Sequence, residues 1–320
     1  MFDITALGEL LIDFSPCGSS ATGMKMLEMN PGGAVANVLC AASKLGLDTA
    51  FIGKVGADAH GSYLRSKLNE YRINTAGLTS TDQAHTTLAF VDIDGNGERS
   101  FSFMRDPGAD TLLTAEELPD DILKSTRIFH VGSLSMTAEP SRSATLAAIE
   151  CARAAGAVIT YDPNYRAMLW SSQEEAVTRM RSLLPMVDMI KLSDDETCLL
   201  TGEADPEEAI RLLLEGGIKC AVVTAGEKGS FVGVKNRVLH VKGFRCRPLD
   251  TTGAGDAFWG AFLTSYLRSG IGLDSLTAEQ AAQFAVFGNA AAAFCVCGRG
   301  AMPAMPEEEQ VWLVMKNNCT

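Results

Sequence analysis

The amino-acid sequence predicts an α/β protein whose mostly parallel sheet is covered by helices on both faces. Short apolar runs with strand character alternate with amphipathic stretches, and this alternation is typical of βαβ units. Of the 320 residues, 47% are hydrophobic and 21% are charged, as in folded globular proteins. Ligands of such sheets bind at the carboxyl ends of the strands, so functional residues are expected there.

The strands and helices follow from this periodicity. Strands are predicted at residues 4–7, 49–55, 128–131, 158–161, 189–192 and 221–224. Helices are predicted near residues 35–45, 60–71, 140–155, 173–184, 206–215, 255–269 and 278–294. No linker or internal repeat interrupts the pattern, so we expect one domain over residues 1–320.

Two segments break the alternation. Residues 86–92 and 99–105 flank the turn at 94–97 and predict an antiparallel hairpin. Residues 15–31, rich in Gly, Ser and Met, form a second non-helical insertion. We interpret the two as a β-lid, spanning about 9–30 and 84–110, over the ligand end of the sheet. A hairpin that only decorates the surface is the alternative.

The composition of the chain excludes some classes of binding partner and location. A net charge of −12 argues against nucleic acid, because no Lys and Arg cluster would neutralise phosphates. We expect no membrane segment, since the most apolar stretch, 290–297, is too short to span a bilayer. The acidic N-terminus is a poor signal peptide. Nine cysteines without CxxC pairs predict buried free thiols and a cytoplasmic location, and four scattered histidines give no support to a zinc site.

Residues 250–258, with the sequence DTTGAGDAF, hold the parts of a phosphoryl-transfer site. Gly253 and Gly255 let the backbone bend, and a helix that begins at about Gly255 would direct its free N–H groups at an anion. Asp256 would repel a bound phosphate, which is easier to explain if this carboxylate takes the proton of a neutral hydroxyl. The alternative is an acid that only favours the helix N-terminus.

A second group of residues suits a polyol. Asp13 lies just past the first predicted strand, where its carboxylate can accept hydrogen bonds from hydroxyl groups. Gly32 and Gly33 allow close backbone approach, and Asn37 can both donate and accept. Taken separately, each residue also has an ordinary structural explanation.

A third group of residues lies at the ends of the predicted strands 158–161 and 189–192. Asn164 and Arg166 lie in a DPNYR segment that is either a stable turn or the source of a fixed charge for a phosphoryl group. Lys191 and Ser193 precede Glu196, which could hold a magnesium-bound water or cap a helix.

A fourth group could form a nucleotide-binding edge. Thr224, Gly226 and Gly229 lie at another strand exit, and Asn289 and Gly300 lie near the C-terminus. An ordinary turn is the alternative for the first three. The sequence has no GxxxxGK[ST] loop and neither the HRD nor the DFG motif of protein kinases.

Taken together, the motifs resemble the ribokinase-like, or PfkB-type, carbohydrate kinase family, and its fructokinases most closely. The resemblance covers nearly the whole chain. It rests on GELLIDF (8–14), PGGAVANV (31–38), FIGKVGADAHG (51–61), GERSFSFMRDPGAD (97–110), DPNYR (162–166), KLSDDE (191–196), DTTGAGDAF (250–258) and GRGAMPAMP (298–306).

The resemblance implies a ribokinase-like three-layer α/β/α fold with a small β-lid, and ATP and Mg²⁺ as co-substrate and cofactor. It implies Asp256 as catalytic base, with Gly253, Ala254 and Gly255 as the anion hole. The implied contacts to sugar or phosphate are Asp13, Gly33, Asn37, Arg105 and Arg166; those on the nucleotide side are Thr224, Gly226 and Asn289; and those to a monovalent cation, such as K⁺, are Asp250, Thr252 and Gly300.

Two positions depart from the family pattern. Val35 stands where fructokinases usually have Pro, and Ser193 stands where the family has Asn, although Glu196 is kept.

The resemblance as a whole implies an ATP-dependent fructokinase that makes fructose 6-phosphate. The alternatives are a 2-keto-3-deoxygluconate kinase or another sugar kinase of the family, and a non-catalytic sugar sensor. For the oligomeric state, a monomer and a homodimer with paired lids are the alternatives.

Overall fold

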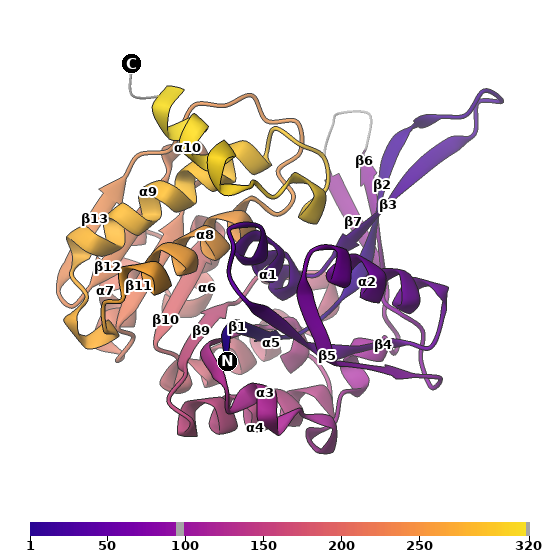
Figure 1. The fold of residues 1–320 in the computed structure, drawn as a ribbon, viewed down its shortest axis with the longest axis horizontal. Coiled ribbons are helices and arrows are strands. Elements are labelled where there is room, and N and C mark those ends of the chain that lie inside the picture. The colour runs from indigo at the N-terminus through magenta and orange to yellow at the C-terminus, as the bar shows by residue number, and fades with distance from the viewer. Residues whose placement is uncertain (94–98, 318–320) are drawn as a thin grey trace.

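A nine-stranded sheet forms the centre of the molecule in the computed structural model, which describes residues 1–93 and 99–317 (Figure 1). The strand order is β13-β12-β11-β10-β9-β8-β1-β4-β5. The strands are β1 (Phe2–Leu7), β4 (Thr49–Gly56), β5 (Ile73–Thr81), β8 (Thr126–Gly132), β9 (Val158–Asp162), β10 (Met189–Ser193), β11 (Cys220–Thr224), β12 (Ser230–Val234) and β13 (Arg237–Val241). Neighbouring strands from β5 to β11 are parallel, whereas β12 and β13 are antiparallel, so the predicted mostly parallel sheet is confirmed.

Helices cover both faces of this sheet. One face carries α1 (Ala34–Lys44), α2 (Ala59–Glu70), α8 (Ala254–Ser269) and α9 (Ala278–Cys295), with α10 (Glu308–Asn317) packed outside α9. The other carries α3 (Asp120–Leu123), α4 (Ser141–Ala154), α5 (Gln173–Leu183), α6 (Asp194–Thr201) and α7 (Pro206–Glu215). The ribokinase-like three-layer fold is confirmed.

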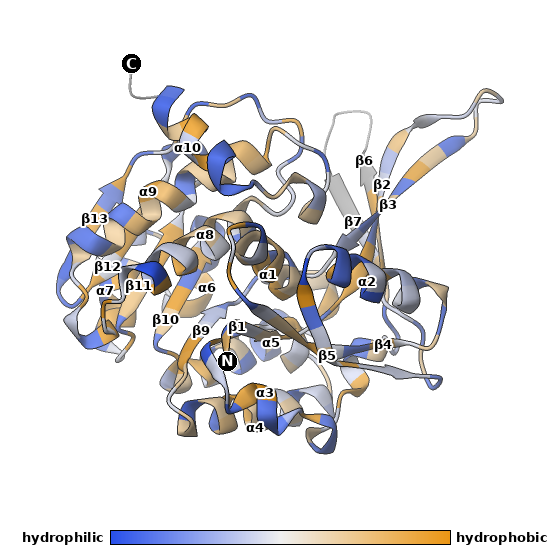
Figure 2. Ribbon diagram, in the orientation of Figure 1, coloured by the Kyte–Doolittle hydropathy of each residue, from blue (hydrophilic) through white to orange (hydrophobic). Residues whose placement is uncertain are grey.

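The two cores follow from the alternation of side chains along the strands. In β11, Val222 belongs to the core under α8 and α9, whereas Val223 belongs to the core under α4 to α7. Successive strand residues point to opposite faces, so strands buried on both sides must be apolar throughout. Figure 2 shows this as hydrophobic central strands, with hydrophilic residues mostly on the surrounding helices and loops.

A separate four-stranded sheet projects from the body, in the order β3-β2-β6-β7 (Figure 1). Its strands are β2 (Leu11–Ser19), β3 (Lys25–Gly32), β6 (Leu88–Ile93) and β7 (Arg99–Met104). The predicted antiparallel hairpin is confirmed in β6 and β7, although its turn at 94–97 lies outside the described residues. The insertion at 15–31 supplies most of a second hairpin, β2 and β3.

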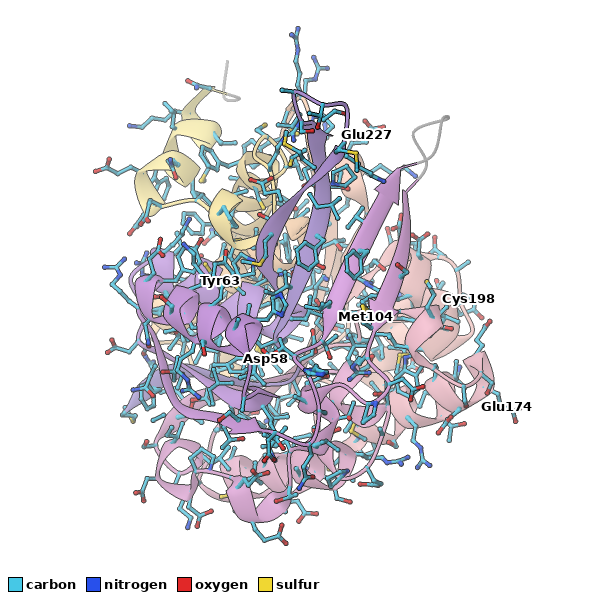
Figure 3. All side chains as sticks on the ribbon, turned by 90° about the vertical axis from the view of Figure 1, so that its right-hand side faces the viewer. Asp58, Tyr63, Met104, Glu174, Cys198 and Glu227 are labelled. Atoms are coloured by element: carbon cyan, nitrogen blue, oxygen red, sulfur yellow. The ribbon has the colours of Figure 1, made fainter. Side chains whose placement is uncertain are left out.

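Aromatic packing and helix α2 support this small sheet. Phe14 of β2 stacks on Phe90 of β6 with ring centroids 5.0 Å apart. The hydroxyl of Tyr63 on α2 donates a hydrogen bond to the carbonyl of Met29 over 3.1 Å. Figure 3 looks onto the sheet, with Tyr63 on the neighbouring helix and Met104 at the end of β7.

The expectation about cysteines was only partly correct. The eight cysteines within the described residues are free, but Cys198, Cys246 and Cys297 are exposed, whereas Cys40, Cys220 and Cys295 are buried. Within the same residues, no helix is long and apolar enough to cross a lipid bilayer.

Candidate active site

Most of the predicted site residues line one cavity of about 490 Å³ at the carboxyl ends of the central strands. Those in its wall are Asp13, Gly33, Asn37, Asn164, Arg166, Lys191, Ser193, Glu196, Thr224, Thr252, Gly253, Ala254, Gly255 and Asp256. Those outside its wall are Gly32, Arg105, Gly226, Gly229, Asp250, Asn289 and Gly300. The topology therefore gathers residues that lie far apart in the sequence.

Asp256 lies in the first turn of α8 and is 8% exposed. Its Oδ2 accepts a hydrogen bond from Nδ2 of Asn37 over 2.8 Å. Burial, and then the Asp162 carboxylate, raise the pKa of Asp256 to about 6, against the opposing effect of Lys191. The group is thus ionised at neutral pH yet basic enough to accept a proton, as a general base must be.

The turn before α8 needs glycine. Gly253 has φ 79°, in the left-handed region, and a Cβ there would lie 2.7 Å from Cβ of Ala301. A Cβ on Gly255 would lie 2.7 Å from Nζ of Lys191. Helix α8 has no side-chain cap. The N–H of Ala254 donates to the carbonyl of Thr251 over 3.3 Å, and the next N–H groups, of Gly255 and Asp256, are available to an anion at the cavity wall.

A buried ion pair lies beneath this turn. Nζ of Lys191 is 2.7 Å from Oδ2 of Asp162, and the two side chains are 7% and 2% exposed. Lys191 is the third residue of β10 and lies inside the predicted strand 189–192. Burial acts to lower the pKa of Lys191, but the Asp162 and Glu196 carboxylates together raise it, so this cation is retained under the anion hole.

The residues predicted to bind a polyol come together at the start of α1. Asp13 follows β1, as predicted, and is also the third residue of β2, because the chain enters this second strand at Leu11. Burial raises the pKa of Asp13 to about 6, and Arg166 opposes the increase. A Cβ on Gly32 would collide with the Asp13 carboxylate, and one on Gly33, at φ 116°, would collide with the carbonyl of Glu9.

Arg105 is already neutralised within the protein. Its Nε and Nη2 donate to Oδ2 of Asp110 over 2.9 and 2.6 Å, and the two side chains are 5% and 3% exposed. It also donates to Thr137 and to the carbonyl of Leu134. In this conformation the guanidinium joins the end of β7 to the body instead of facing the cavity.

Glu196 caps a helix and also faces the cavity. Its Oε2 accepts from the backbone N–H of Ser193 at the start of α6, and its Oε1 accepts from that of Tyr165 over 2.7 Å. A carboxylate oxygen can accept more than one hydrogen bond, so the cap leaves Glu196 able to bind a water at the cavity wall.

The three residues predicted for a monovalent cation come together. Oδ1 of Asp250 accepts from the backbone N–H and the hydroxyl of Thr252, and its Oδ2 accepts from the N–H of Gly300 over 3.1 Å. This contact ties the segment before the anion hole to the loop after α9.

The predicted nucleotide side is only partly in the cavity. Thr224, at the end of β11, is part of its wall. Gly226 and Gly229 lie in the following turn, both with positive φ. Asn289 on α9 donates to the carbonyls of Val241 and Lys242, over 3.1 and 3.2 Å, and so holds the segment after β13.

Comparison with known proteins decides the family. Residues 1–308 match the family model described as pfkB family carbohydrate kinase. The chain belongs to this family. The kinase is 41% identical over 320 residues to probable fructokinase-5 of Arabidopsis thaliana, which covers 98% of this chain and 97% of the relative.

Solved structures give the same result. The kinase superposes on fructokinase from Xylella fastidiosa with bound ATP at a TM-score of 0.91 and 31% identity, over 99% of both chains. A double-mutant fructokinase from Vibrio cholerae, with fructose, ADP and potassium ion bound, gives a TM-score of 0.87 and 30% identity over 98% of both chains.

Several wall residues of the kinase were not identified from the sequence. Three of them are apolar, namely Leu11 of β2 and Phe103 of β7 in the small sheet, and Leu134 in the turn after β8. Glu9 is also in the wall and is 2% exposed. Glu9 could have been found as an acid within the otherwise apolar run GELLI, because a carboxylate is rarely buried among apolar residues without a bonding partner.

Proposed function

We propose that this kinase is an ATP-dependent fructokinase, which transfers the γ-phosphoryl group of ATP to a primary hydroxyl of D-fructose. The observation that carries the proposal is the position of Asp256. This buried carboxylate lies beside the glycine turn and is held by Asn37, in the same wall as Asp13. The names of the Arabidopsis, Xylella and Vibrio proteins support fructose as the substrate.

In the proposed reaction Asp256 takes the proton of the sugar hydroxyl while that oxygen attacks the γ-phosphorus. The bond from the γ-phosphorus to the β,γ-bridging oxygen breaks, and fructose 6-phosphate and ADP leave. Backbone N–H groups of residues 253–255 and the cation of Arg166 would stabilise the negative charge on the transferring group. Asp13 and Asn37 would orient the sugar.

Magnesium fits the residues present. Mg²⁺ is usually held by one or two carboxylates together with substrate phosphates and water, and Glu196 offers one carboxylate in the cavity wall. When bound, the ion would neutralise negative charge on the phosphates of ATP. Lys191 and Ser193 lie close to Glu196 in the sequence and belong to the same wall, which supports their predicted place on the ATP side.

Three further assignments belong to this proposal. Asp250, Thr252 and Gly300 would bind a monovalent cation such as K⁺, because hydrogen bonds from Thr252 and from the N–H of Gly300 hold the Asp250 carboxylate beside the anion hole. The four-stranded sheet would act as the lid, since Leu11, Asp13 and Phe103 reach the cavity from it. The free thiols of the eight described cysteines agree with a cytoplasmic location.

A sugar acid such as 2-keto-3-deoxygluconate is a weaker candidate. Its carboxylate would need a cation in the cavity wall. Of the two predicted arginines, Arg105 is paired with Asp110 and only Arg166 lies in the wall. Glu9 and Asp13 add acidic groups to the same wall. A non-catalytic sensor is also disfavoured, because Asp256 and the glycine turn are both intact.

A coupled ADP-release assay tests the proposal directly. The purified protein would be given ATP and Mg²⁺ with fructose, ribose, 2-keto-3-deoxygluconate, adenosine or fructose 6-phosphate. We expect the highest kcat/KM with fructose. Faster phosphorylation of the keto acid would reassign the substrate. If none of these compounds led to ADP release, the sugar kinase activity would be refuted.

A further inference from the structure

The carboxylate of Glu9 is only half explained by the fold. Glu9 lies in the connection between β1 and β2, is 2% exposed and forms part of the cavity wall. Its Oε1 accepts a hydrogen bond from the backbone N–H of Ala34 over 2.7 Å. Its Oε2 has no hydrogen-bond partner among the described residues. Buried polar atoms nearly always have partners, so an unpartnered carboxylate oxygen needs a reason.

Helix capping accounts for Oε1. Helix α1 starts at Ala34 after Gly33, which has no side chain with which to cap it. Glu9 supplies the missing acceptor from 25 residues upstream. A shorter amide or hydroxyl could serve as that cap without burying a second oxygen, so the cap does not explain Oε2.

The cavity wall that contains Glu9 suits a hydroxyl group. Asn37, in the same wall, also leaves a buried oxygen, Oδ1, without a partner. Burial raises the pKa of Glu9 to about 7, against the opposing effect of its own backbone N–H and that of Ala34. A hydroxyl can donate to the carboxylate or accept from the carboxylic acid, whereas a ligand carboxylate could bond only to the protonated form.

We propose that Glu9 is a specificity-determining residue of the sugar pocket, where Oε2 bonds one hydroxyl group of a neutral sugar while Oε1 holds the start of α1. The inference rests on the proposed function and refines it. It predicts that one hydroxyl of the substrate, other than the one phosphorylated, depends on Glu9. The remaining hydroxyls do not.

The test combines variants with altered substrates. kcat/KM is measured for fructose and for a series of monodeoxyfructoses, with the wild type and with Glu9→Leu and Glu9→Gln. In the wild type we expect one deoxy analogue to lose at least roughly 10-fold through its missing contact with Glu9. In Glu9→Leu that loss should shrink to within about threefold, whereas the losses for the other analogues stay unchanged. Glu9→Gln should keep it, because an amide still bonds a hydroxyl.

A matched control separates binding from capping. Asp205 caps α7 by accepting from the N–H groups of Glu207 and Glu208 over 3.0 Å, and it lies outside the cavity wall. Asp205→Ala should lower the melting temperature and leave every ratio between sugars unchanged. If Glu9→Leu behaves in the same way, Glu9 is only a cap and the inference is wrong. Should Glu9→Leu not fold, Glu9→Asp, which is too short to make both contacts, takes its place.

Failure of the wild type to phosphorylate fructose would refute the proposed function rather than the role of Glu9. In that case the same variants are compared for the sugar that the wild type does phosphorylate and its deoxy analogues. A uniform loss across that series again overturns the inference, and a loss confined to one hydroxyl again supports it.

Discussion

Nδ2 of Asn37 lies 2.8 Å from Oδ2 of Asp256, so an amide on α1 orients a carboxylate on α8 across 219 residues of sequence. The contact fixes one oxygen of the proposed base and leaves the other for a substrate proton. It also joins the sugar side of the cavity to the phosphoryl side. The predictions below follow from this arrangement and from the groups beneath it.

Asn37→Ala should lower kcat by roughly 10- to 100-fold, because the carboxylate loses its fixed orientation. The hydrogen bond from Asn37 also lowers the pKa of Asp256, so the acid limb of the kcat profile should move to higher pH. Steady-state kinetics across pH would show both changes. Asn69→Ala, at an exposed position of α2 outside the cavity wall, is the control and should change neither quantity. An unchanged kcat and pH profile in Asn37→Ala would refute the orienting role.

Gly253→Ala should abolish most turnover, because a methyl group there meets Ala301 and φ 79° disfavours alanine. Gly270→Ala provides the matched control. Gly270 ends the same helix at φ 65° with nothing within 4 Å of its Cβ position, so it suffers the strain without the collision. We expect about 1 kcal/mol of destabilisation and near-normal kcat for the control. Equal activity of the two variants would argue against the anion hole.

Activity should fall at acid pH. Asp13 and Asp256 both have pKa values raised by burial to about 6, and the proposed base works only when it has lost its proton. kcat/KM should therefore stay constant above pH 7 and decrease as pH falls through about 6. The apparent pKa values read from the profile belong to Asp13 and Asp256 together rather than to either residue alone. Circular dichroism at each pH confirms that the fold persists. An acid limb near pH 4 would show that neither carboxylate limits the reaction.

Lys191→Met should destabilise the protein by about 3–5 kcal/mol in urea unfolding, because Asp162 would become a buried charge without a partner. The double variant Asp162→Leu/Lys191→Met removes both charges and should recover most of that loss. Arg211→Ala, in an exposed pair with Glu207 at 3.2 Å, should cost less than about 1 kcal/mol. A double variant no more stable than Lys191→Met would contradict this account of the pair.

The sequence predicted the parts of the fold with strong periodicity. All six predicted strands lie in the large sheet, and the seven predicted helices correspond to α1, α2, α4, α5, α7, α8 and α9. Strands β2 and β3 were seen only as a non-helical insertion, because Gly, Ser, Pro and Met have no clear strand pattern. Their pairing comes from tertiary contacts such as the stacking of Phe14 on Phe90.

In the site, motifs indicated which residues meet but not how each is used. Asp256 and Asn37 were both identified, yet their direct hydrogen bond depends on how α1 packs against α8. Arg105 was predicted to contact sugar or phosphate, and its pairing with Asp110 is invisible in the sequence because either residue alone suits a lid. Glu9 was overlooked because an acid beside a strand has many ordinary roles.

The most direct test of the central claim is the turnover of Asp256→Asn with fructose and ATP, together with the affinity for fructose measured by calorimetry. The substitution keeps the size of the side chain and an acceptor for Asn37, but it removes the base. We predict that kcat falls at least roughly 10²-fold while the affinity for fructose is largely kept. Unchanged turnover would show that Asp256 is not the base.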